Sequence, residues 1–319
     1  MPKKTVGSRI VGVNSGVNLG AFAFGGDVYY LDPVDGLDGN DGKSPESAVK
    51  TLEVGYGKLR DGENDTLVVI GTATQINITG ETGLTWSKSY THLVGGTADF
   101  PGVGQRVKIV APASLDATYV LQVTGNGCVF KNLNIQNEND AAEDSWAVYI
   151  TGNRNYWENV FFNGMLSATA AARAGSGSLK LVCSDGENYF YRCTIGTNHQ
   201  ARTAANSELS LNAPSCEFKD CNFLSSTSGG GTAHFFVNIA GSASGAEPDY
   251  SIFRDCLFIN NYQVTMTDAF TKTATGTHWV FMKGCLGEGF TGWSDTVAMI
   301  YSADPAPNNG FGLGTNPAA

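Results

Sequence analysis

The sequence contains no apolar run that approaches the roughly 20 residues a helix needs to cross a bilayer. Its first residues, MPKKTVGSRIVGVNSG, carry charge but no continuous apolar segment and no clear cleavage site, so a signal peptide is not indicated. Lysine and arginine number 20 against 30 aspartates and glutamates, and no dense basic run follows the start. Because phosphate groups are bound by clustered cations, neither nucleic acid nor a membrane is an expected partner.

Short motifs of catalytic and metal sites are also missing. The seven cysteines form no CxxC pair and lack zinc-site spacing, which favours buried free thiols in a reducing compartment over a disulfide framework. The histidines lie outside the H-E-x-x-H motif, and G-x-S-x-G is absent. We therefore expect the histidines to be loop or surface residues. They are His92, His199, His234 and His278.

Apolar and aromatic residues are plentiful, at 42% and 11% of the chain, so disorder by composition is excluded. One short pattern recurs: a large apolar residue, two further residues, a small or medium apolar residue, and then alternation. The six segments with this pattern are FKNLNI at 130, WENVFF at 157, FYRCTI at 190, FKDCNF at 218, FRDCLF at 253 and MKGCLG at 282.

Aligned on their fourth residue, the segments form three apolar columns. The fourth positions are Leu133, Val160, Cys193, Cys221, Cys256 and Cys285. Three residues earlier stand Phe130, Trp157, Phe190, Phe218, Phe253 and Met282. Two residues later stand Ile135, Phe162, Ile195, Phe223 and Phe258, and the column fails at Gly287. The step of two matches a strand, but the step of three breaks that period, so we expect a bend between the first two columns.

The residue before the fourth position supports the bend. These residues are Asn132, Asn159, Arg192, Asp220, Asp255 and Gly284. All but the arginine are Asn, Asp or Gly, which most easily adopt a left-handed conformation at a tight corner. Successive fourth positions lie 27, 33, 28, 35 and 29 residues apart, as in a solenoid with variable loops. We predict an all-β fold, a single-stranded right-handed parallel β-helix with an internal cysteine ladder and extended terminal arms.

The segment 28–72 carries a different signal. Its stretch GKSPESAVKTL matches the pattern G-x-S-P-x-x-A-x-x-T-L through Gly42, Ser44, Pro45, Ala48, Thr51 and Leu52. This segment resembles the opening of pectate-lyase-like β-helix proteins. The resemblance implies an opening strand, a turn, a short capping helix at 49–59 and the first coil. A cap is also expected physically, because the open end of a β-helix exposes apolar core and unpaired strand edges.

Four regions follow from these patterns. Residues 1–27 are expected to be an N-terminal arm that attaches to a particle or partner. Residues 28–72 form the opening strand and capping segment, 73–300 the parallel β-helix, and 301–319 an extended C-terminal tail.

Asp220 and Asp255 share one column on successive coils, and Arg192 lies on the coil before. Stacked strands lie about 4.8 Å apart. The two carboxylates could therefore act as acid and nucleophile in sugar chemistry, an arrangement that resembles pectate-lyase-like enzymes. Corner geometry explains the acids equally well and is the favoured interpretation, so no catalytic residue is predicted.

The turn DPVDGLDGNDG places Asp32, Asp35, Asp38 and Asp41 three residues apart with interleaved glycines. Calcium prefers clustered oxygen ligands, but the calcium loop of an EF-hand has acids at every second position and ends in Glu. Asp-Gly pairs are also ordinary turn formers. We favour a structural turn, and predict no metal and no cofactor.

A β-helix, free thiols without a signal peptide and an adhesive arm together resemble the structural proteins of bacteriophage particles. The resemblance implies a homotrimer that is made in the bacterial host cytoplasm, joins the virion and contacts the major capsid protein or another virion protein. The chain has no room for the extra domains of a tailspike. The favoured prediction is a non-enzymatic capsid decoration or cement protein.

The alternative is a tailspike-like protein that binds or cleaves glycans, as a polysaccharide lyase or glycoside hydrolase. It would need a groove lined by acids and by aromatic faces for sugar stacking. Trp86, Trp146, Trp279 and Trp293 could supply those faces, although aromatics in a β-helix more often fill corners or cover ends. A glycan is therefore kept as a possible partner.

Overall fold

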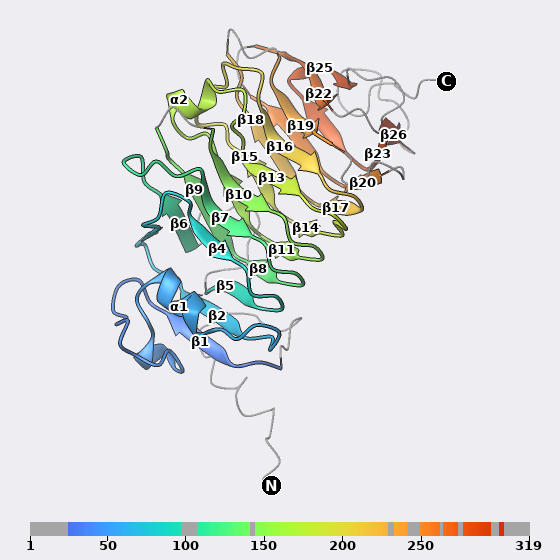
Figure 1. Ribbon diagram of the computed structural model, residues 1–319. Helices are drawn as coiled ribbons and strands as arrows, with labels where there is room; N and C mark the ends of the chain where they lie inside the picture. The colour runs from blue at the N-terminus through green and yellow to red at the C-terminus, as the bar shows by residue number, and fades with distance from the viewer. Residues whose placement is uncertain are drawn as a thin grey trace.

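The computed structural model describes residues 25–96, 107–140, 144–228, 233–241, 249–261, 264–273, 277–294 and 300–302. Its strands pair in parallel and stack coil upon coil from β1 at the blue end to β26 at the red end (Figure 1). This confirms the predicted parallel β-helix. Most of the expected arms, residues 1–24 and 303–319, lies outside the described residues. In the described part, no helix is long and apolar enough to span a membrane.

Three parallel sheets form the walls, with ten, eight and eight strands among the described residues. Sheet A contains β1 (Val28–Leu31), β2 (Thr66–Ile70), β5 (His92–Gly96), β8 (Val129–Lys131), β11 (Tyr156–Glu158), β14 (Tyr189–Tyr191), β17 (Cys216–Lys219), β20 (Asp249–Arg254), β23 (His278–Lys283) and β26 (Ile300–Ser302). Sheet B contains β3 (Ile76–Asn77), β6 (Val107–Ala111), β9 (Leu133–Asn137), β12 (Phe161–Asn163), β15 (Thr194–Gly196), β18 (Asn222–Ser225), β21 (Leu257–Asn260) and β24 (Leu286–Glu288). Sheet C contains β4 (Leu84–Trp86), β7 (Tyr119–Val123), β10 (Trp146–Ile150), β13 (Leu179–Val182), β16 (Ser207–Asn212), β19 (Phe235–Ile239), β22 (Met266–Lys272) and β25 (Phe290–Ser294).

The corners between sheets A and B lie where the sequence predicts them. All six corner residues have a positive φ, between 53° and 67°. Most corners span two residues, as expected, and only Asn132 intervenes between β8 and β9. The corner backbones also bond between coils: the N–H of Asp220 donates to the carbonyl of Arg254 at 2.9 Å, and that of Asp255 to Lys283 at 2.7 Å. The corners therefore add their own hydrogen bonds to those of the sheets.

Aromatic rings stack along the core behind sheet A. The ring centroids of Phe130 and Trp157 lie 4.0 Å apart. Phe218 lies 4.6 Å from Phe190 and 4.9 Å from Phe253, and all these pairs are close to parallel. All five side chains are fully buried. Such stacked pairs contribute roughly 0.5–1.5 kcal/mol beyond the burial of their area, so the aromatic column of the sequence is a continuous stabilising ladder.

A second ladder consists of cysteines. The Sγ atom of Cys221 donates to the carbonyl of Phe190 at 3.4 Å, and that of Cys256 donates to the carbonyl of Phe218 at 3.3 Å. All seven cysteines are buried and free, as predicted. Burial raises the pKa of Cys183 to about 12. Cys183, which lies outside this ladder, therefore behaves as a small apolar side chain rather than as a nucleophile.

The N-terminal end is covered by α1 (Leu52–Lys58), which lies within the predicted segment 49–59, and is preceded by the short 3₁₀ turn η2 (Pro45–Ser47). Thr51 caps the helix and Leu52 is buried in the main core. A β-carbon at Gly55 would come 2.8 Å from the side chain of Leu67, so glycine allows the helix to lie close to β2. The predicted capping helix is therefore present.

Sheet C is the wall that the repeated pattern did not reveal. The loops that lead to it from sheet B vary in length, and the loop after β12 contains α2 (Ala168–Ala171). The strands β7, β10, β13 and β16 each begin 11 residues before the aromatic column, a regularity that the repeated pattern left out. At β19 and β22 the distance lengthens to 18 and 16 residues, and the column is lost. The long loops gather along the edge of the solenoid where sheet B ends (Figure 1), and the candidate site lies there.

Candidate functional site

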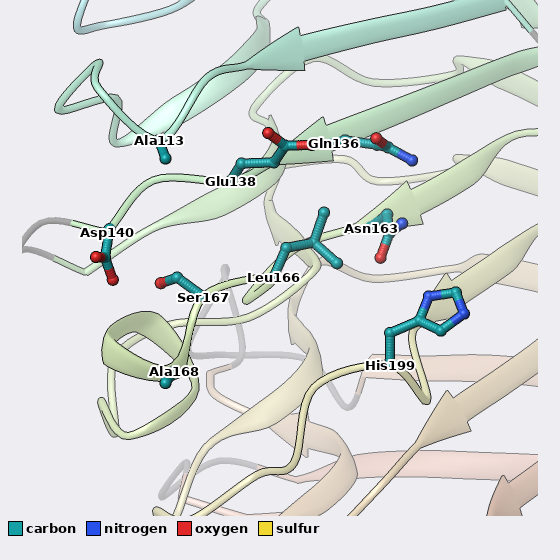
Figure 2. Close-up of a pocket in the computed structure, with 9 residues that line it drawn as sticks. All are labelled: Ala113, Gln136, Glu138, Asp140, Asn163, Leu166, Ser167, Ala168 and His199. Carbon is teal, nitrogen blue, oxygen red and sulfur yellow. The ribbon is translucent and has the colours of Figure 1, made fainter.

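A pocket of about 580 Å³ opens over the ends of β9, β12 and β15 (Figure 2). Its side chains come from successive coils, which bring residues far apart in the sequence to one opening. The lining residues are Ala113, Gln136, Glu138, Asp140, Asn163, Leu166, Ser167, Ala168 and His199. Two carboxylates, two amides, a hydroxyl and an imidazole therefore share this cavity.

Glu138 and Asp140 reach the pocket because the segment after β9 continues the alternation of the strand. Asn137, the last residue of β9, and Asn139, which lies between the two acids, are buried. Both asparagines donate from Nδ2 to the carbonyl of Ala117 at 3.1 Å, and the N–H of Asn139 donates to Oδ1 of Asn137 at 3.0 Å. These bonds fasten the segment to the solenoid, so the alternate residues, the two acids, face outward.

Asn163, the last residue of β12, lines the pocket and has a buried amide oxygen. The residue is 3% exposed, and its Oδ1 has no hydrogen-bond partner among the described residues. A buried polar atom without a partner costs roughly 1–3 kcal/mol. Oδ1 exposes almost no surface, so a ligand hydroxyl or amine would remove this cost only after the side chain turns toward the cavity.

Another wall of the pocket begins at Ser167, the N-cap of α2. The Ser167 hydroxyl donates to the carbonyl of Asn139 at 2.7 Å and accepts the N–H of Ala170 at 3.0 Å. The bond to Asn139 links the α2 loop to the loop that carries the two acids. His199 is an exposed residue in the loop after β15, and Figure 2 shows its ring below Asn163.

The three residues considered for catalysis, Arg192, Asp220 and Asp255, lie at the corners between sheets A and B, and none of them lines the pocket. The guanidinium of Arg192 lies 4.8 Å from the ring centre of Tyr191, which is a cation–π contact. The carboxylate of Asp255 covers Gly284, where a β-carbon would come 2.1 Å from Oδ1. These contacts fit the favoured interpretation as structural corners, and a catalytic role for the three residues stays an untested alternative.

The acidic turn makes hydrogen bonds of its own. Asp32 accepts the N–H of the residue two positions on at 2.8 Å, Asp41 does the same at 3.0 Å, and Asp38 accepts the N–H of Thr51 at 2.9 Å. Asp35 is exposed. In the described part, no three acidic, histidine or cysteine residues come together as a metal site would require. Three of the four carboxylates thus have the bonding expected of turn formers, and calcium binding there stays untested.

The prediction that the histidines lie in loops or at the surface is wrong for His92 and His278, which lie in β5 and β23; His234 lies in a loop but is buried. His92, His234 and His278 are buried, and only His199 is exposed. Nδ1 of His92 accepts a backbone N–H at 3.1 Å, and Nε2 of His278 lies 3.0 Å from the hydroxyl of Ser251. Burial lowers the pKa of His92 and of His278 to about 4 each. A neutral imidazole with a hydrogen-bond partner can be packed beneath a strand, which the composition of the neighbouring sequence does not reveal.

The tryptophans considered for sugar stacking do not line the pocket either. Trp86, Trp146 and Trp293 are buried, and Trp279 lies on β23 of sheet A. Burial removes the faces of Trp86, Trp146 and Trp293 from any ligand, and Trp86 and Trp293 fill the solenoid core as expected, whereas Trp279 is partly exposed.

The sequence reasoning missed the residues that do line the pocket. One signal was available: NEND at 137–140 continues the alternation directly after an apolar rung, with acids at every second position. A second was the polar position that follows the third apolar column, held by Gln136 on one coil and Asn163 on the next.

No protein-family model and no curated protein matches this sequence. Solved structures match in fold. A pectin methylesterase in complex with a hexasaccharide superposes with a TM-score of 0.56 at 12% identity, over 91% of this chain and 93% of that one. Pectin methylesterase PemA from Erwinia chrysanthemi gives 0.55 at 12% identity, over 88% and 91%.

Pectate lyase Pel9A gives a TM-score of 0.53 at 14% identity, over 81% of this chain and 62%, less than two thirds, of that one. Identities this low show the fold alone. The chain therefore has the predicted right-handed parallel β-helix of pectate-lyase-like proteins. The predicted likeness to bacteriophage proteins finds no support among these structures.

Proposed function

We propose that this β-helix protein binds a glycan in the pocket over β9, β12 and β15 and hydrolyses it. The proposal rests on one observation: the carboxylates of Glu138 and Asp140 share a single cavity with the amide residues Gln136 and Asn163. Its volume of about 580 Å³ is ordinary for a small-molecule site. This is the alternative of the sequence analysis, and the pocket favours it over a purely structural role.

The charge of the pocket selects the class of glycan. Two of its nine lining residues are carboxylates, and none is Lys or Arg. A uronate would bring a further negative charge beside Glu138 and Asp140, which is unfavourable, whereas an amino group would be attracted. We therefore propose a neutral or amino-sugar oligosaccharide as the ligand.

Hydrolysis of a glycosidic bond requires one carboxylic acid to protonate the leaving oxygen and one carboxylate to activate water or attack the sugar. Glu138 is the more enclosed of the two acids and Asp140 is exposed. In the proposed mechanism Glu138 protonates the leaving oxygen and Asp140 activates the water. The Asn163 amide turns into the cavity so that Oδ1 accepts a sugar hydroxyl, and His199 offers a further hydrogen bond that orients the ring.

The proposal is tested with three probes in buffer that contains EDTA: chitosan oligosaccharides, neutral cello-oligosaccharides and oligogalacturonates. Binding is measured by calorimetry and products by mass spectrometry, where hydrolysis adds one water per bond cleaved. Glu138→Gln and Asp140→Asn are each expected to slow cleavage about 100-fold or more while binding persists. Asn163→Ala is expected to weaken binding about 10-fold.

Two corner substitutions, Asp220→Asn and Asp255→Asn, are the matched controls and should leave cleavage unchanged. If these controls lost cleavage while the pocket variants stayed active, the catalytic site would lie at the corners instead of in the pocket. Failure of all three probes to bind would refute the proposed function.

An assembly role has a separate observation in its favour. Tyr250, Phe281 and Tyr301 are 39%, 40% and 43% exposed on the outer face of sheet A. The ring of Phe281 lies 6.2 Å from that of Tyr250 and 5.6 Å from that of Tyr301. Contiguous exposed apolar surface of this kind marks contact sites. As a second candidate we therefore retain a homotrimeric structural protein of a bacteriophage virion, such as a capsid decoration or cement protein.

Light scattering after size-exclusion chromatography tests the assembly role. We expect a trimer for the wild type and a monomer for Phe281→Ser, while deletion of residues 1–27 should abolish binding to virus particles but preserve the trimer. A monomeric wild type, or its absence from purified particles, would exclude this second candidate.

A further inference from the structure

A cluster of charged side chains is fully buried beneath the pocket loops. Arg202, Glu208 and His234 are each 0% exposed. Nε of Arg202 donates to Oε1 of Glu208 at 2.8 Å, and Nε2 of His234 lies 3.5 Å from the same oxygen. The hydroxyl of Ser178 donates to the other oxygen of Glu208 at 2.6 Å. Apolar side chains could fill this space without the cost of burying charge, so simple core packing does not account for the cluster.

The remaining donors of Arg202 bind the backbone of the pocket walls. Nη1 donates to the carbonyl of Met165 at 2.7 Å and to that of Gln200 at 3.3 Å, and Nη2 donates to the carbonyl of Gly164 at 3.5 Å. Met165 directly precedes the pocket residues 166–168, and Gln200 directly follows His199. One guanidinium thus holds two loops that line the pocket from different coils.

The loop that Arg202 holds has an unfavourable backbone conformation at the point of contact. Met165 has a φ of 53°, in the left-handed region that non-glycine residues rarely adopt. Farther along the same loop, Nδ2 of Asn206 donates to the carbonyls of Ala171 and Arg173, at 3.0 Å each. Buried side chains from the following coil therefore fix the loop at its start and near its middle.

We propose that Arg202, held in place by Glu208, is a positioning residue of the pocket. It sets the separation between the wall that carries Ser167 and the loop that carries His199, and it touches no ligand itself. The binding consequence of this role rests on the proposed glycan site, whereas the ordering of the two loops does not.

Amide hydrogen exchange, followed by mass spectrometry, tests the ordering directly. Arg202→Lys keeps the charge but loses the planar fork that reaches several carbonyls at once. We expect exchange in 164–168 and 197–201 to rise about 10-fold or more, with the rung 216–225 unchanged. Arg154→Lys is the matched control, because Arg154 is exposed and pairs with Glu187 on another face, and it should alter neither loop.

A chitosan tetrasaccharide tests the binding consequence. Arg202→Lys is expected to weaken its binding about 10-fold. Val280→Ala removes part of a buried core side chain remote from the pocket and should lose stability but leave the dissociation constant unchanged. Equal weakening in both variants would mean that general destabilisation, not positioning, accounts for the effect.

The proposal would be overturned if both loops of the Arg202→Lys variant exchanged their amide hydrogens at the same rate as in the wild type. Should that variant fail to fold, Ser178→Ala loosens Glu208 without leaving a charge unpaired. Because the Ser178 hydroxyl also accepts the N–H of Gly164 at 3.2 Å, the expected result for this variant is faster exchange in 197–201. A wild type that binds no oligosaccharide would defeat the proposed function alone, since the exchange experiment decides the role of Arg202 independently.

Discussion

The rings of Phe190 and Phe218 stack with their centroids 4.6 Å apart and their planes 6° from parallel. They belong to neighbouring coils, and β14 and β17 pair so that the two residues are direct partners. Side-chain stacking and backbone pairing therefore enforce the same register. A slip of one coil by one residue would turn every ring of that coil away from the core.

Substitution of Phe218 should therefore be costly. Phe218→Ala is expected to lower the free energy of unfolding by about 4 kcal/mol, because it removes a fully buried ring that stacks on both sides. Phe218→Leu should lose less. Tyr250→Ala, at an exposed position, should cost under about 1 kcal/mol. Urea unfolding followed by tryptophan fluorescence measures all three, and a small loss for Phe218→Ala would contradict the ladder as a main source of stability.

Asp65 should be a critical residue at the capped end. Its buried carboxylate accepts two bonds from the Arg60 side chain, at 2.7 and 2.9 Å, and the backbone N–H of Asp27 at 2.7 Å. Burial alone would raise the pKa of Asp65, but these bonds outweigh it and keep the pKa below its ordinary value. Asp65→Asn is expected to cost about 3 kcal/mol. The exposed Asp185→Asn is the control, and equal melting temperatures of the two variants would exclude this role.

The buried histidines predict a loss of stability in mild acid. The pKa of His92 and of His278 is about 4 in the folded protein, against an ordinary value of 6.5. Between these values the unfolded chain binds protons that the folded chain does not, so stability falls as the pH falls from about 6.5 towards 4. At pH 5 the loss is about 2 kcal/mol for each histidine.

Urea midpoints measured at pH 7.5, 6 and 5 test this dependence. His278→Asn should flatten the profile between pH 6 and pH 5, whereas replacement of the exposed His199 should not. A midpoint that stays constant from pH 7.5 to pH 5 would show that these histidines do not control acid stability.

The thiols should be inert in the folded protein. All seven are buried, and burial raises the pKa of Cys183 to about 12 and also raises that of Cys216 and Cys221. At pH 8 the native protein is expected to react negligibly with Ellman's reagent within an hour, and to release seven equivalents of thiol in guanidinium. Rapid reaction of one thiol in native protein would identify a coil that opens locally.

The rungs could be predicted from the sequence because their determinants are local. A strand of period two and a left-handed corner, such as those at Asn132 and Asp220, require the same kinds of residue at the same spacing on every coil. Sheet C was missed although β7, β10, β13 and β16 each begin 11 residues before the aromatic column, because the spacing changes at β19 and β22 and the loops that precede the sheet vary in length. A column becomes visible only where the spacing is constant.

The candidate site escaped prediction for a related reason. Glu138, Asn163 and His199 come from loops or strand ends on three coils, and only the stacking of those coils brings them together. Arg202 and Glu208 are close in sequence, but nothing in their neighbourhood indicates that both are fully buried. Conversely, Asp220 and Asp255 were considered as catalytic candidates because they occupy the same corner position on successive coils. That repetition is a property of the fold rather than of a reaction.

The exposed loops and the core rungs obey different constraints, and this gives the molecule an adjustable length. Each coil pairs only with the coils before and after it. A tandem duplication of residues 193–220, the span from Cys193 to the residue before Cys221, would insert one further coil. Its aromatic ring, thiol and corner would follow the same pattern as on the other coils. Growth by this duplication would carry the pocket farther from the C-terminal end and present a second copy of His199 and Arg202 on the new coil.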